Sequence, residues 1–168
     1  FLFAAFMYST IEIPQEPYVP KPGGFWANTA GTIADGFRII FSTPPVRRII
    51  TAKALWSVFG GGLVYMLVLV GEDIGLGNFA AGIGILFAAR GLGTGLGPIL
   101  ARYAFTERSR WPFLLGWLVS VCGLAYVAIG WLEWSPWIAV LVTFGHAASG
   151  ANWVLSTVLL QERSEDAW

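Results

Sequence analysis

Four long apolar stretches dominate this sequence of 168 residues. A helix needs about 20 mostly apolar residues to cross the hydrocarbon core of a bilayer. The sequence therefore predicts four transmembrane helices, over residues of about 46–71, 76–102, 111–132 and 136–161. Because backbone groups in lipid must be satisfied within the protein, we expect an all-α polytopic bundle over residues 46–163.

The basic residues gather at one end of this predicted bundle. Threading the four spans alternately brings the following residues to one face: Lys21, Arg38, Arg47, Arg48, Lys53, Arg102, Arg108, Arg110 and Arg163. The charged residues in the connections on the opposite face are all acids: Glu72, Asp73 and Glu133. An excess of Lys and Arg marks the cytoplasmic side of a membrane. We therefore predict a multi-pass membrane protein whose first span runs outward.

Composition agrees with a lipid environment and argues against other classes of protein. Hydrophobic residues make up 56% of the chain and charged residues 12%, about half the charge of a soluble domain. The formal net charge is zero, which gives nucleic acid no basic surface to bind. The single cysteine, Cys122, offers neither a disulfide framework nor a metal site. With one histidine and no catalytic motif, we expect no enzyme and no bound cofactor.

The first 45 residues differ from the spans. Residues 1–10 are predicted to be the end of a preceding transmembrane helix, and residues 11–45 a cytoplasmic linker rich in proline at first. Within the linker, apolar residues at three- and four-residue steps predict an amphipathic helix: Trp26, Ala30, Ile33, Phe37, Ile40 and Phe41. Residues 164–168 are predicted to begin a further cytoplasmic loop. We expect a piece of a longer protein whose N-terminal half is missing.

Glycines mark two of the spans. In the second, Gly91 and Gly95 stand four residues apart, as do Gly93 and Gly97, a spacing that lets helix backbones approach closely. The first span carries Gly60, Gly61 and Gly62 in succession. Each glycine weakens a helix by roughly 1 kcal/mol relative to alanine. This run predicts either a hinge or a close helix contact.

Polar residues at membrane depth are the candidate functional groups. Arg90 lies near the centre of the second span, where it costs at least about 2.5–3.5 kcal/mol. It should face a water-filled cavity, a substrate or a carboxylate, and the predicted spans offer no carboxylate at that depth. His146 in the fourth span could relay protons or bind substrate, or it could make a hydrogen bond between helices. Ser149, Asn152 and Ser156 form a polar stripe on the same helix, which either lines a cavity or joins helices.

Three segments carry a resemblance to a known family. They are FRIIFSTPPVRRII at 37–50, AARGLGTGLGPILAR at 88–102 and ANWVLSTVLLQER at 151–163. In order and spacing they resemble the second half of a major facilitator superfamily transporter, in its drug- and siderophore-exporter branch, the enterobactin-exporter-like group. That family often has a G-x-x-x-D-R-x-G-R-R loop. Here Gly97 and Arg102 keep two of its positions, whereas Ala101 replaces the aspartate and Ala104 the second glycine.

The resemblance implies a secondary active transporter in a bacterial inner membrane. It would export a small organic compound by alternating access, with a proton or other ion gradient as the energy source. The first and fourth predicted spans would line the cavity, and the third would lie outside the bundle. The alternatives are a permease subunit of another fold, such as one driven by a separate ATPase, and a membrane sensor or scaffold without transport. A channel is a weaker alternative, because the sequence holds no filter-like motif.

Overall fold

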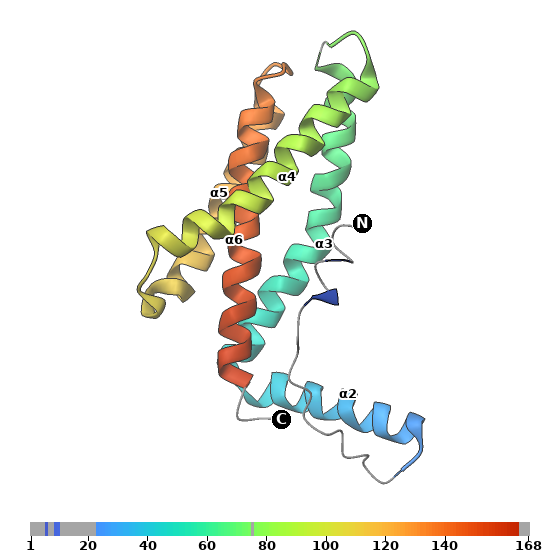
Figure 1. The fold of residues 1–168 in the computed structure, drawn as a ribbon, viewed down its shortest axis with the longest axis vertical. Helices are drawn as coiled ribbons and strands as arrows, with labels where there is room; N and C mark the ends of the chain where they lie inside the picture. The colour runs from blue at the N-terminus through green and yellow to red at the C-terminus, as the bar shows by residue number, and fades with distance from the viewer. Residues whose placement is uncertain (1–5, 7–8, 11–22, 75, 165–168) are drawn as a thin grey trace. The chain divides into compact units, whose positions relative to one another are not determined.

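The computed structural model describes residues 6, 9–10, 23–74 and 76–164. Their regular structure is entirely helical, without a strand, as the sequence predicts (Figure 1). Three predicted segments lie wholly or mostly outside the described residues: most of the preceding helix (1–10), the first third of the linker (11–22) and nearly all of the loop (164–168). The chain divides into two compact units, residues 1–38 and 39–168, which are described separately below.

Helix α2 (Phe25–Ser42) confirms the predicted amphipathic helix. It buries no residue, and its large apolar side chains are exposed: Phe25, Trp26, Ile33, Phe37 and Phe41. Asp35 and Arg38 form an ion pair of 3.0 Å along the helix. An exposed apolar stripe beside charged groups is the pattern of a helix that lies in a membrane interface.

Four longer helices form the second unit: α3 (Pro44–Asp73), α4 (Phe79–Ala104), α5 (Trp111–Trp131) and α6 (Ile138–Ser164). Each is long and apolar enough to cross a membrane. The four predicted spans are therefore confirmed as helices, with boundaries that shift by up to three residues. A short 3₁₀ turn, η1 (Arg108–Arg110), precedes α5.

Local sequence explains where these helices begin. Thr43 precedes α3 with an extended backbone, and Pro44 occupies the first helical position, where a missing N–H costs nothing. The side chain of Asn78 accepts a hydrogen bond of 2.9 Å from the Ala80 N–H and caps α4. Before α6, the Ser135 carbonyl accepts a hydrogen bond from the Ile138 N–H.

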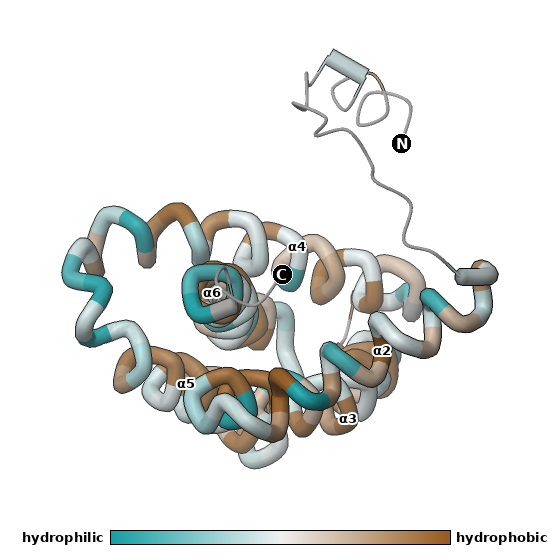
Figure 2. The backbone as a smooth tube through the Cα atoms, turned by 90° about the horizontal axis from the view of Figure 1, so that it is seen from below, coloured by the Kyte–Doolittle hydropathy of each residue, from teal (hydrophilic) through white to brown (hydrophobic). Residues whose placement is uncertain are grey.

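Helix α6 is the centre of the bundle. It makes the most extensive contact with α4 and the next with α5, and α3 packs mainly against α4. Viewed close to its axis in Figure 2, α6 lies between α4 and α5. In the most apolar 18-residue stretch of α6, 50% of the stretch is buried. The corresponding share is 22% to 28% in the other spans. Apolar side chains from all four helices fill the main core, including Leu67, Leu86, Ile129 and Val142.

Glycines bring α4 and α6 into backbone contact. A Cβ on Gly93 would meet the Thr143 carbonyl, and one on Gly97 would meet the Ala147 carbonyl. Of the two pairs with this spacing, Gly93 and Gly97 therefore contact α6 as expected, whereas Gly91 and Gly95 have open space around them. The difference has a geometric reason. Residues two positions apart in a helix are rotated by about 200° around its axis, so the two pairs lie on nearly opposite faces.

The run of glycines in α3 leaves the helix unbroken. Gly61 and Gly62 would have nothing within 4 Å of an added Cβ, and the three atoms nearest to a Cβ on Gly60 belong to the Trp56 ring of the same helix. Among the described helices, this run therefore makes no close contact between helices, and the hinge stays a prediction.

Helix α5 buries one face and exposes the other. The buried face includes Cys122, Tyr126 and Ile129. Exposed residues include Phe113, Trp117 and Leu124. The structure does not single out the third span as the outer one: 28% of its most apolar stretch is buried, against 22% for α3 and for α4.

Candidate functional site: a cationic cavity between three helices

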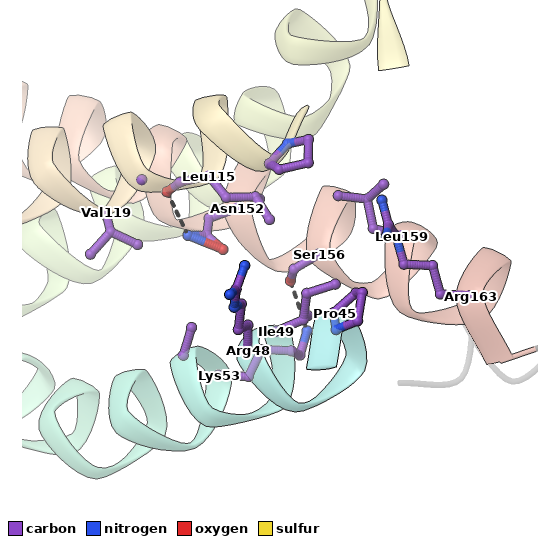
Figure 3. A pocket seen from close by; sticks show the side chains of 13 residues that line it. Pro45, Arg48, Ile49, Lys53, Leu115, Val119, Asn152, Ser156, Leu159 and Arg163 are labelled. Atoms are coloured by element: carbon purple, nitrogen blue, oxygen red, sulfur yellow. Dashed lines mark hydrogen bonds between the residues drawn. The ribbon is translucent and has the colours of Figure 1, made fainter. Parts of the chain in front are cut away.

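A cavity of about 610 Å³ opens between α3, α5 and α6 (Figure 3). Its walls are mostly apolar and its polar lining is confined to a few side chains. The lining residues are Pro45, Arg48, Ile49, Ala52, Lys53, Pro112, Leu115, Gly116, Val119, Asn152, Ser156, Leu159 and Arg163. Small-molecule sites in proteins have this character and size.

Lys53 links α3 to α6 across the cavity. Its Nζ donates to Ser156 Oγ at 3.0 Å and to Thr157 Oγ1 at 2.9 Å. A longer bond of 3.3 Å reaches the Trp153 carbonyl, and the ammonium lies 3.8 Å from the centre of the Trp153 ring. Every one of these partners is neutral. The side chain is therefore solvated by dipoles and an aromatic face without a counter-charge.

Two further cations join Lys53 in the lining, and none of the acids in residues 23–74 and 76–163 does. Arg48 extends from α3 near Lys53, and Arg163 lies in the last turn of α6. Ion pairs in the described residues involve other arginines: Arg38 with Asp35, Arg108 with Glu162, and Arg110 with Glu107. The cavity therefore has a positive electrostatic character.

The polar stripe predicted on the fourth span borders this cavity. Asn152 lines it and donates a 3.3 Å hydrogen bond to the Leu115 carbonyl of α5. Ser156 lines it and accepts from Lys53. Ser149 is buried and lines a smaller adjoining hollow with Trp56. The stripe thus does both things considered from sequence, lining a cavity and joining helices.

Arg90 and His146 lie apart from this cavity. His146 is 3% exposed and Tyr126 of α5 is 5% exposed; His146 Nε2 and the Tyr126 hydroxyl are 2.7 Å apart. Arg90 of α4 is half-buried, and its Nε is buried with no hydrogen-bond partner among the described residues. No ion pair with a described carboxylate involves Arg90. The interhelical hydrogen bond considered for His146 is therefore present.

Two of these residues are not among the candidates predicted from the sequence. Tyr126 is a phenol within a run of aliphatic side chains in an apolar span. Lys53 groups with the cytoplasmic charges in the sequence, although it follows the start of its span by more than two turns. A cation at that depth needs polar partners. The position of Lys53 in its span therefore predicts a polar contact with another helix.

Gly97 and Arg102, the two residues kept from the G-x-x-x-D-R-x-G-R-R motif, lie in different surroundings. Gly97 contacts α6, as described above, and Arg102 is exposed in the last turn of α4. The loop after α4 is instead tied to the end of α6 by the ion pair of Arg108 with Glu162. A carboxylate therefore does hold this loop, but it comes from a distant part of the chain.

Comparison with protein-family models, with curated proteins and with solved structures finds no match to this chain. The described residues also hold no cluster of three or more His, Cys, Asp or Glu side chains that could bind a metal ion.

Proposed function

We propose that this chain is part of a secondary active transporter that moves a small organic compound across a membrane. The observation that carries the proposal is the cavity of about 610 Å³ between helices that are long and apolar enough to span a bilayer. A packed structural bundle has no need for such a space, whereas a transporter needs one that its substrate can enter.

The polar groups fit this reading. Lys53, Asn152 and Ser156 supply hydrogen-bonding groups inside an otherwise apolar cavity, which would orient a bound compound. Arg90 keeps a buried, unpaired Nε at membrane depth. Such a group is costly unless a substrate, water or an absent acid completes it. The resemblance to major facilitator exporters adds an alternating-access cycle, outward transport and an ion gradient to the proposal.

The distribution of charge supports a place in a plasma membrane with the cavity toward the cytoplasm. Arg48, Lys53 and Arg163 all belong to the basic end of the bundle. By the positive-inside rule this end faces the cytosol. A substrate would then enter the cavity from inside the cell, the direction that export requires.

An efflux assay tests the proposal. Cells that express the complete open reading frame would be loaded with a panel of fluorescent and toxic organic compounds, with and without a protonophore. We expect at least one compound to leave these cells faster than it leaves controls, and the difference to vanish with the protonophore. Equal retention of every compound by both sets of cells would count against transport.

A further inference from the structure

Among the described residues, the lining of the cavity carries positive charge and no negative charge. Arg48, Lys53 and Arg163 contribute the charge, and no Asp or Glu in the described part of the chain lines the space. Lys53 is the decisive residue because it is half-buried between α3 and α6, where charge interactions are stronger than in bulk water. Its polar partners among the described residues are a carbonyl and two hydroxyls. A charge kept there without a counter-ion points to an anion that arrives as a ligand.

The hydrogen bonds around Lys53 leave room for such an anion. The Trp153 carbonyl also accepts from Ser156 Oγ at 3.0 Å and from Thr157 Oγ1 at 2.7 Å. It would therefore remain satisfied if Lys53 turned one N–H toward a ligand. The 3.3 Å bond from Lys53 to this carbonyl is its longest and the easiest to exchange. A charge-assisted bond to an oxyanion would be stronger.

The rest of the lining specifies an apolar body. Ile49, Leu115, Val119 and Leu159 present aliphatic side chains, and each buried CH₂ of a ligand contributes about 0.8 kcal/mol. In Figure 3 the side chains of Arg48 and Lys53 extend from α3 toward Asn152 and Ser156 of α6. An acid group held between these helices would leave its carbon chain against the aliphatic wall.

We propose that this cavity binds an amphiphilic organic anion, whose phosphate or carboxylate group meets Lys53 and Arg48. The proposal deepens the proposed function by naming its substrate class, and it distinguishes this chain from exporters of lipophilic cations. Two sources share this chemistry: an anionic phospholipid of the cytoplasmic leaflet and a free organic acid. Like-charge repulsion from three cations excludes a cationic ligand.

Binding can be measured without transport. The complete protein would be placed in nanodiscs of uncharged lipid and titrated with octyl phosphate, octyl glucoside and octyltrimethylammonium. We expect saturable binding of octyl phosphate only, followed as a rise in melting temperature with concentration. Lys53→Met keeps the length of the side chain and removes its charge, so it should weaken this binding at least about tenfold. Lys53→Arg should restore most of it.

Arg47→Met is the matched control, because Arg47 is an exposed cation on the same helix outside the cavity lining. It should bind octyl phosphate as the parent protein does. If Lys53→Met lowers stability too far, Arg48→Met tests the same charge at a more exposed position. Equal binding of the three octyl compounds, unchanged phosphate binding in both cavity variants, or no saturable binding at all would overturn the proposal.

A second arm separates the two sources. Native mass spectrometry of protein released from nanodiscs that contain phosphatidylglycerol would show whether one anionic lipid stays bound, and whether Lys53→Met loses it. Retained lipid assigns the site to the membrane, and octyl phosphate binding without retained lipid assigns it to a free acid. Binding with no efflux of any organic acid would refute the proposed transport function and leave the anion site standing.

Discussion

At the scale of single residues, the contact between Tyr126 and His146 is the clearest polar link inside the bundle. Both side chains are buried, and they come from different helices. Interhelical hydrogen bonds in membrane proteins contribute about 0.6 kcal/mol on average and up to about 1.7. We expect Tyr126→Phe to lower the free energy of unfolding by about 1 kcal/mol, because it leaves His146 Nε2 unpaired. Thermal unfolding in detergent measures this, with Tyr65→Phe as an exposed control on α3. Equal melting temperatures for both variants would contradict it.

Arg90 carries a second prediction at this scale. Its Nε lacks a partner in the described residues, so we expect the guanidinium to serve transport rather than stability. In the complete protein, Arg90→Ala should reduce export at least about tenfold while the protein still inserts in the membrane. Efflux of the compound identified by the panel and immunoblots of membrane fractions measure the two quantities. Wild-type efflux from this variant would rule the role out.

At the scale of elements, the crossing of α4 and α6 depends on glycines that face another backbone. Gly97→Ala would push its Cβ into the Ala147 carbonyl, and overpacking of this kind costs about 1–3 kcal/mol. Gly95→Ala adds a methyl group where space is open, so it should be neutral or stabilise the helix by up to about 1 kcal/mol. Unfolding of the two variants side by side tests the crossing. An equal change in stability at both positions would show that the contact of Gly97 with α6 does not decide the outcome.

At the scale of the whole molecule, the orientation in the membrane is open to a direct test. Cys122 is the single cysteine of the chain and is buried, so a Cys122→Ala background is suitable for labelling. Ser109→Cys, between α4 and α5, should be protected from an impermeant thiol reagent in intact cells. Ser135→Cys, between α5 and α6, should be labelled. These outcomes follow from the positive-inside rule, and the reverse pattern would place the cationic cavity on the outer side.

The order of the helices was predictable because the signals are local. Each signal depends on neighbours within a few turns. The signals are stretches of 20 or more apolar residues, Thr43 before Pro44 and Pro45, and the three- and four-residue steps of α2. They located helices α2 to α6 to within about three residues, with α2 recognised as amphipathic. The polar stripe of Ser149, Asn152 and Ser156 was also readable, because all three belong to one helix.

Tertiary structure alone decided which faces meet. Lys53 finds its hydroxyl partners 103 and 104 residues away, and Tyr126 meets His146 on another helix. The spacing of glycines in α4 was compatible with either of two faces, and only the position of α6 selected Gly93 and Gly97. Periodicity specifies what a helix presents around its axis, but rotation and partner depend on side chains that are distant in the sequence. That is why the spans followed from the sequence by itself, and the cavity only from their assembly.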